Sequence, residues 1–337
     1  MLTIRKTLAV LALGIGLQAG LAKADDTITI AYQTGFSLFV RAVASGEIEK
    51  ISGVHVEFRQ FNSGAEIFAA IASGDVQIGD VGSSPFAAST SKGIDVKAIH
   101  ISGAAGEDEA LVARNGSGIE KMEDLKGKRL AAAPVSTDHF MLLSTLKQLG
   151  IKPDEATVLA IPQPEIVAAW QRGDIDAAFV WDPALGKLLE NGKPLLTAKQ
   201  AAERGAVTFG ALVATADLIK DKPEFLQNFV SIVDKYYRDL EQNPAHWAAD
   251  SENVQVLAKF SGAKPKDIAE RLKVSVYVPA GEQAGSTWLG GGSESKLAHV
   301  LHDTAEFLKE QQKITTVLDD YSAFIDPRFV SATLASN

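Results

Sequence analysis

Five short segments of the sequence are rich in hydroxyl and amide side chains and contain no lysine or arginine. They are residues 33–34, 62–64, 82–85, 136–139 and 181–183. Ser or Thr at the start of a helix caps its first backbone N–H groups. The N–H groups that stay free, together with the helix dipole, attract an anion. These residue types therefore indicate a site where neutral dipoles hold a weakly basic anion such as a sulfonate.

The candidate ligand-binding residues come from these segments. Each has an ordinary alternative role, because a hydroxyl before a helix is usually only a cap and an isolated Trp or His is often structural. Several such segments at the ends of successive strands favour binding over capping alone. The candidates are Gln33, Thr34, Ser63, Ser83, Ser84, Thr137, His139, Trp181 and Asp182.

Alternating strand and helix patterns must position these residues. Strand patterns occur at residues 27–32, 54–58, 76–81, 96–101, 129–133, 157–160 and 175–180, and helical patterns lie between them. This alternation predicts an α/β fold with mostly parallel strands and helices on both faces of the sheet. Ligands of such sheets bind beyond the carboxyl ends of the strands, which is where the five segments lie. The C-terminal third is predicted to be helical, with apolar periodicity over residues 223–240 and 295–309.

The chain is longer than the ~250–300 residues at which a single core usually stops growing, so two lobes are expected. The sequence Ala-Leu-Val-Ala occurs at residues 110–113 and again at residues 211–214, on either side of the second set of strands. Two such antiparallel connecting strands would form the hinge of a clamp. We predict a first lobe from residues 25–112 and 211–337, and an inserted second lobe from residues 113–210.

The N-terminus has the pattern of an export signal. Arg5 and Lys6 precede an apolar run over residues 8–21, and Ala22 and Ala24 fit the small-residue cleavage pattern. A membrane anchor is the alternative, but the run is shorter than the ~20 residues of a span and contains glycines. We predict that residues 1–24 are a cleaved signal peptide and that the mature protein is soluble in the periplasm. The chain has no cysteine, which excludes a lipoprotein, disulfides and a cysteine nucleophile.

Composition and motifs argue against several other classes of protein. The formal net charge of −9 and the lack of a basic patch are unfavourable for binding nucleic acid. The catalytic and nucleotide-binding motifs with known mechanics are absent, so no catalytic residue is assigned. His299 and His302 have no third ligand nearby, and the acidic residues 107–109 lack the spacing of a calcium loop. We therefore expect no metal and no cofactor. An exported enzyme and the sensor half of a transcription regulator are the alternatives, and the latter would need a DNA-binding segment where the export signal lies.

Several short motifs, in the same order, resemble those of taurine-binding periplasmic proteins, the substrate-binding subunits of ABC taurine importers. The resemblance covers essentially the whole mature chain and rests on residues 30–34, 72–79, 82–85, 136–139, 168–176, 307–311 and 320–322. It implies a type II periplasmic binding protein with two α/β lobes joined by a two-strand hinge. It also implies a monomer that docks onto an ABC permease with a cytoplasmic ATPase. By this resemblance, Gln33, Ser63, Ser83, Ser84, Thr137, His139, Trp181 and Asp182 line the cleft.

Two positions depart from the family pattern. The family places one carboxylate after the first strand and another before the second hinge strand, whereas Ser37 and Gly210 occupy the matching positions here. Because a buried ammonium without an acceptor is costly, we predict that Asp182, together with Glu109, takes over the amine contact. The alternative ligand is an amine-free sulfonate with an apolar or aromatic tail resting on Phe36 and Trp181. Nitrate and thiamine-precursor ligands, which related binders take, stay open.

Overall fold

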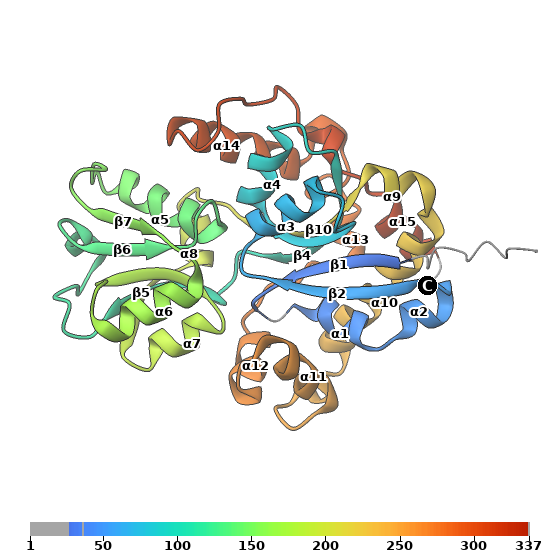
Figure 1. The fold of residues 1–337 in the computed structure, drawn as a ribbon, viewed down its shortest axis with the longest axis horizontal. Coiled ribbons are helices and arrows are strands. Elements are labelled where there is room, and N and C mark those ends of the chain that lie inside the picture. Colours follow the sequence, from blue (N-terminus) through green and yellow to red (C-terminus); the bar gives the residue numbers. More distant parts are fainter. Residues whose placement is uncertain (1–26, 36, 336–337) are drawn as a thin grey trace, which may run out of the picture.

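A computed structural model describes residues 27–35 and 37–335 of the chain. The predicted signal peptide and Phe36 lie outside the described residues. Within them, two five-stranded sheets lie side by side, each covered by helices (Figure 1). The first sheet has the order β2 (His55–Phe61), β1 (Thr27–Gln33), β3 (Ile78–Gly82), β10 (Phe209–Thr215), β4 (Val96–Ala104). The second has the order β7 (Thr157–Ala160), β6 (Arg129–Ala132), β8 (Ala177–Trp181), β5 (Glu109–Arg114), β9 (Gly192–Thr197).

The strand directions agree with the prediction of mostly parallel sheets, except that each sheet contains one antiparallel strand. β1 is parallel to β2 and β3, and β6 is parallel to β7 and β8. β10 is antiparallel to β3 and β4, and β5 is antiparallel to β8 and β9. Residues 28–32 of β1 are all buried, as expected for a strand covered on both faces.

The chain changes sheet earlier than the predicted boundary at residues 112 and 113. β4 ends in the first sheet at Ala104, and β5 begins in the second at Glu109. The chain returns between α8 (Ala198–Glu203) and β10, which begins at Phe209. The strands that contain residues 110–113 and 211–214 therefore lie in different sheets. Each occupies a buried position next to the parallel strands of its own sheet. We call residues 27–104 and 209–335 the first lobe and residues 109–203 the second lobe.

The helices pack on both sheets. Those of the first lobe before the crossing are α1 (Leu38–Ala44), α2 (Glu47–Ser52), α3 (Gly64–Ala72) and α4 (Ser83–Thr90). Those of the second lobe are α5 (Thr137–Gln148), α6 (Gln163–Arg172), α7 (Ala184–Leu189) and α8. The chain after β10 is helical, as predicted, with α9 (Ala216–Asp221), α10 (Pro223–Gln242), α11 (Glu252–Ser261), α12 (Pro265–Leu272), α13 (Ala280–Gln283), α14 (Lys296–Glu310) and α15 (Arg328–Ala335).

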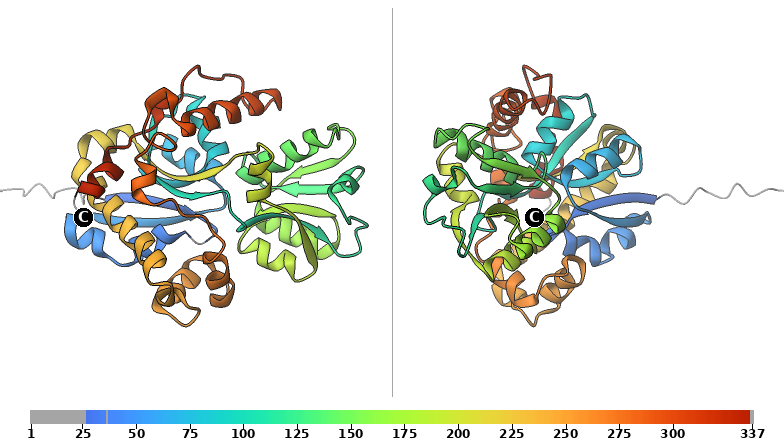
Figure 2. Two further views of the ribbon diagram at one scale, coloured as in Figure 1. Left: turned by 180° about the vertical axis from the view of Figure 1, so that it is seen from behind. Right: turned by 60° about the vertical axis from the view of Figure 1, so that its left-hand side comes forward.

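The C-terminal third contacts the second lobe at two places. α14 extends toward α5 (Figure 2). There the ring of Phe307 packs edge-on against Phe140 with 5.1 Å between centroids. Lys147 of α5 also forms an ion pair with Glu310 at 2.6 Å. α12 lies near α7, and the segment after it forms an antiparallel bridge between Val276 and Ala104 beside the first crossing. These contacts place the two lobes against each other in this structure.

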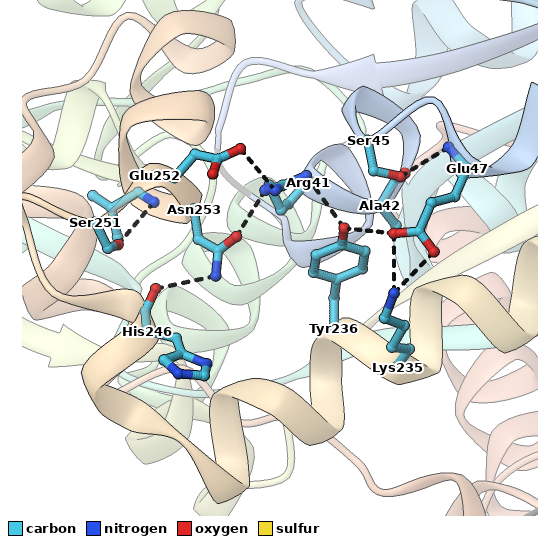
Figure 3. A network of polar contacts seen from close by, with 11 residues as sticks. Arg41, Ala42, Ser45, Glu47, Lys235, Tyr236, His246, Ser251, Glu252 and Asn253 are labelled. Carbon is cyan, nitrogen blue, oxygen red and sulfur yellow. Dashed lines mark hydrogen bonds and ion pairs between the residues drawn. The ribbon is translucent and has the colours of Figure 1, made fainter.

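A polar network fixes α1 to α10 and α11 within the first lobe. Arg41 donates to Asn253 at 2.7 Å and to the hydroxyl of Tyr236 at 3.3 Å, and it forms an ion pair with Glu252 (Figure 3). Tyr236 in turn donates to Glu47, which also accepts from a lysine of α10. The side chain of Arg41 thereby joins α1 to two helices that lie far from it in the sequence.

Candidate functional site

A cavity of about 170 Å³ lies between the lobes, at the carboxyl ends of the parallel strands of both sheets. Its wall comes from three parts of the chain. The first lobe contributes the ends of β1 and β3 and the start of α3, and the second contributes the starts of β5 and α5. The segment after α12 closes one side with Ser275, Val276 and Tyr277. The cavity therefore lies where ligands bind to open α/β sheets.

Three helix starts converge on this cavity. Ser63 caps α3 by accepting from the backbone N–H of Glu66, and Ser136 caps α5 by accepting from His139. Two glycines allow the close approach: a Cβ at Gly64 would lie 2.7 Å from Pro85, and one at Gly82 would lie 2.7 Å from Thr137. The side chains at these starts are small and polar, and the converging N-termini favour an anion.

α4 begins without a side-chain cap. Ser83 and Ser84 are fully buried, and their hydroxyl groups have no hydrogen-bond partner among the described residues. Neither lies on the cavity wall, but Gly82 and Pro85 on either side of them do. Since no acidic residue occurs in the first turn of α4, its start is the least compensated of the three helix termini.

Three carboxylates also line the cavity. Asp80 of β3 accepts a 2.6 Å hydrogen bond from Ser102. Asp108 belongs to the first crossing and accepts from Ser275 at 3.0 Å, and Glu109 is the first residue of β5. This arrangement is suited to an ammonium group, because a cation there would compensate several buried carboxylates at once.

Burial raises the pKa of each of these carboxyl groups. The pKa of Asp80 rises to about 6, against the stabilising hydrogen bond from Ser102. The pKa of Asp108 rises to about 6 for the same reason. Burial and the neighbouring Asp108 raise the pKa of Glu109 to about 7. Burial and Glu109 also keep the pKa of Asp138, in the first turn of α5, well above its ordinary value. The cavity therefore gains electrostatically from a bound cation.

Gly210 is explained by this pocket. A Cβ at this position would lie 2.6 Å from the hydroxyl oxygen of Ser102, which donates to Asp80. A carboxylate at position 210 would displace Ser102, so the Ser102 and Asp80 pair occupies the space that an acidic side chain would need. Ser37 also lies on the cavity wall.

Trp181 and Asp182 join the two lobes. The indole N–H of Trp181 donates to the backbone oxygen of Thr34 at 2.5 Å. One carboxylate oxygen of Asp182 accepts from the backbone N–H of Gly186, and the other forms a 2.9 Å ion pair with Arg271 of α12. Both oxygens of Asp182 are thus occupied within the protein, so the structure favours other carboxylates as acceptors for an amine.

His139 has an internal role in this structure. Its side chain is buried, and its Nδ1 accepts from the backbone N–H of Val135, a residue with a positive φ of 56°. Burial and the nearby Lys313 lower the pKa of His139 to about 4, so the imidazole is neutral at neutral pH. It supports the loop that leads into α5 and does not line the cavity.

The cavity wall thus brings together most of the candidates from the sequence, namely Gln33, Thr34, Ser63, Glu109, Thr137, Trp181 and Asp182. Ser83, Ser84 and His139 lie behind it. Sequence reasoning missed Asp80 and Ser102, although an aspartate between apolar residues of a buried strand is a usable signal. It considered Asp108 only as part of an acidic cluster without calcium-loop spacing, and it gave no role to Arg271, which meets Asp182 only in the folded chain.

His299 and His302 do not form a metal site. His299 contacts the backbone oxygen of Ser293, and His302 lies 3.7 Å from Asp303. Over the described residues, no three His, Cys, Asp or Glu side chains are placed to hold one metal ion. In the same part of the chain, no helix is both long and apolar enough to cross a membrane.

This chain is similar to one family model and to several known binding proteins. The family model described as NMT1/THI5 like matches residues 50–246. The taurine-binding periplasmic protein of Escherichia coli (strain K12) is 39% identical over 90% of this chain and 92% of its own length. The crystal structure of the periplasmic aliphatic sulphonate binding protein SsuA from Escherichia coli has a TM-score of 0.71 at 20% identity, covering 90% of this chain and 92% of that one. The predicted fold class of a periplasmic binding protein is confirmed by this likeness.

An enzyme structure shares the fold at a lower similarity. A cysteine-to-serine mutant of DSZB in complex with biphenyl-2-sulfinic acid has a TM-score of 0.61 at 15% identity, covering 93% of this chain and all of that one. The fold therefore occurs both in binding proteins and in an enzyme, and only the site can separate the two activities.

Proposed function

The chain belongs to the NMT1/THI5-like family, and on that basis we propose that it captures taurine between its two lobes and delivers it to an ABC importer. The observation that carries the proposal is the polarity of the cavity. Helix starts with small hydroxyl side chains line one part, and Asp80, Asp108 and Glu109 line another. A zwitterion with a sulfonate at one end and an ammonium at the other matches both parts.

For the sulfonate, we propose contacts with the starts of α3 and α4. Ser63 and Gly64 form part of the wall, and Gly82 exposes the start of α4 to the cavity. Thr137 and Gln33 lie beside them and supply further polar groups. Glu109 is only 3.4 Å from the hydroxyl of Thr137, so the start of α5 is already compensated by a carboxylate. That difference supports placing the anion on the first lobe.

For the ammonium, we propose Asp80 as the principal acceptor, with Asp108 and Glu109 beside it. This revises the expected role of Asp182, whose oxygens are held by Gly186 and Arg271. Glu109 keeps its predicted role. An amine-free sulfonate would leave these carboxylates without a counter-charge, which disfavours the alternative ligand.

The cavity size supports a small ligand. Its volume of about 170 Å³ is below the ~300–1,000 Å³ usual for drug-sized ligands. A long tail resting on Trp181 would have to extend beyond a cavity of this volume. We therefore favour taurine over a sulfonate with a long or aromatic tail.

We propose a binding protein rather than an enzyme, located in the periplasm and acting as a monomer with a permease and a cytoplasmic ATPase. The named relatives that bind taurine and aliphatic sulphonate support this proposal. The DSZB structure contains a mutated cysteine, whereas this chain has no cysteine at all. In the cycle we propose, the lobes close around the ligand because it contacts both of them.

The test is calorimetric titration of residues 25–337, refolded to remove carried-over ligand, with taurine and with ethanesulfonate. The two differ by the ammonium group. We expect tight binding of taurine and weak binding of ethanesulfonate. Asp80→Asn should lower taurine affinity by about ten-fold or more, since a hydrogen-bonded charge contributes ~1.5–3 kcal/mol, and should leave ethanesulfonate binding no weaker. Equal binding of both ligands by the wild type would contradict the amine assignment.

A further inference from the structure

Arg271 is the basic residue that meets a buried cavity-wall carboxylate across the boundary between the lobes. It belongs to α12 of the first lobe, and its partner Asp182 follows β8 of the second lobe. The carboxylate side chain is only 5% exposed and that of Arg271 is 22% exposed, whereas the nearby Lys264 and Glu190 pair is 74% and 65% exposed. The two ion pairs join the same helix to the second lobe but differ strongly in burial.

The backbone on which Arg271 stands is tied to the first crossing between the lobes. The oxygen of Val276 accepts from Ala104 at 2.9 Å, and the oxygen of Val274 accepts from Glu107 at 3.3 Å. Ser275 donates to the backbone oxygen of Arg271 and to Asp108 of the crossing. A rotation of the second lobe about this crossing would therefore move Asp182 relative to an anchored Arg271.

Loss of the Arg271 guanidinium costs more free energy when the lobes are in contact than when they are apart. With the lobes in contact, loss of Arg271 would leave Asp182 buried with only the backbone N–H of Gly186 as a partner. With the lobes apart, water would reach the carboxylate and solvate it. Removing the guanidinium therefore disfavours the arrangement in which the lobes touch, and not the open one.

We propose that Arg271 is a closure latch, a positioning residue that raises ligand affinity through Asp182 without touching the ligand. The pair stabilises the arrangement in which the cavity is complete. It also engages one oxygen of Asp182 while the backbone N–H of Gly186 engages the other, which leaves the amine to Asp80, Asp108 and Glu109. This inference rests on the proposed function for its affinity readout, but the latch itself is independent of the identity of the ligand.

The experiment measures lobe separation directly. Because the chain has no cysteine, spin labels attach only to introduced ones, and Arg59→Cys in β2 and Glu165→Cys in α6 place one exposed label on each lobe. Pulsed electron resonance then gives the distance distribution with and without saturating taurine. Titration calorimetry on unlabelled protein gives the affinity.

We expect Arg271→Gln to shift the ligand-free distribution toward longer distances and to weaken taurine binding by about ten-fold. The matched control Lys264→Gln breaks the exposed pair of the same helix and should change the affinity by less than about two-fold. Adding Asp182→Asn to Arg271→Gln should cause no further opening, because the buried charge is then gone.

Distance distributions and affinity of Arg271→Gln equal to those of the wild type would overturn the latch. If Arg271→Gln does not fold, Asp182→Asn removes the same ion pair while keeping an acceptor for Gly186. We expect it to open the lobes less than Arg271→Gln would, because no unpaired carboxylate is then buried, and ligand-free distances equal to those of the wild type would overturn the latch. If the wild type binds neither taurine nor ethanesulfonate, the proposed function fails, yet the ligand-free distances still decide the latch.

Discussion

In the proposed function, Asp80 and Ser102 form the residue pair on which ligand discrimination depends most directly. Their 2.6 Å hydrogen bond orients a carboxylate that burial would otherwise neutralise. The glycine at position 210 leaves room for this pair, because any Cβ there would lie against the hydroxyl of Ser102. A single methyl group can therefore test the amine site without removing a charge.

We predict that Gly210→Ala lowers taurine affinity by about five- to ten-fold, corresponding to the loss of a hydrogen bond of ~1–1.5 kcal/mol. The new methyl would push Ser102 away from Asp80, while the start of α4 stays in place for the sulfonate. Titration with taurine and ethanesulfonate checks this, with Gly281→Ala as control, since a Cβ there has its nearest neighbour at 4.0 Å. An equal loss for both ligands would show that the change deforms the whole cavity.

At the scale of elements, the helices after β10 complete the apolar core of the first lobe and also make polar contacts with α1. Arg41 supplies the hydrogen bonds and the ion pair that link α1 to α10 and α11 (Figure 3). Its side chain is mostly buried, at 12% exposure, although its partner Glu252 is 84% exposed. The stabilising contribution should therefore come from the hydrogen bonds to Asn253 and Tyr236 more than from the exposed ion pair.

We predict that Arg41→Ala lowers the free energy of unfolding by about 1–3 kcal/mol and leaves taurine affinity unchanged. Chemical denaturation and calorimetry give the two quantities. Glu252→Ala is the matched control and should cost less than about 1 kcal/mol, because it removes only the exposed partner. A larger loss of unfolding free energy in Glu252→Ala than in Arg41→Ala would contradict the view that the hydrogen bonds of Arg41 stabilise the lobe more than its exposed ion pair.

The elements also show what could be predicted from sequence. Strands such as residues 157–160 and helix starts such as Ser63 and Ser136 were predictable, because apolar periodicity and capping are local signals. The sheet change before Glu109 was not, since pairing of β5 with β8 is a long-range choice that a local repeat does not encode. Arg271 and Asp182 are 89 positions apart, so their ion pair lay beyond any local pattern.

For the molecule as a whole, the raised pKa values of the cavity carboxyl groups connect ligand binding, stability and pH. Asp80 and Asp108 have pKa values of about 6 and Glu109 of about 7, all above the ordinary range. Below these values the groups are neutral and attract an ammonium weakly, whereas above them the groups are charged. The sulfonate stays ionised throughout, so changes in affinity report on the carboxylates.

We predict that taurine affinity rises as the pH increases from about 5 to about 8, with release of protons on binding. In the ligand-free protein, stability should fall over the window from about pH 4 to about pH 7, because the folded state there holds more protons than the unfolded chain. Calorimetry in buffers of different ionisation enthalpy and thermal unfolding measure both effects. Taurine affinity independent of pH, or falling as pH rises, would contradict the carboxylate assignment.

The sheet order of the first lobe has a consequence for how the chain is made. β4 pairs with β10 in the sheet order, and β10 also separates β4 from β3. Residues 105–208, the whole of the second lobe with its crossings, must be synthesised between β4 and β10. At about 5–20 residues per second this takes roughly 5–20 s. During that delay β4 has no neighbouring strand in the first sheet, so the first lobe cannot complete its sheet until β10 has been made.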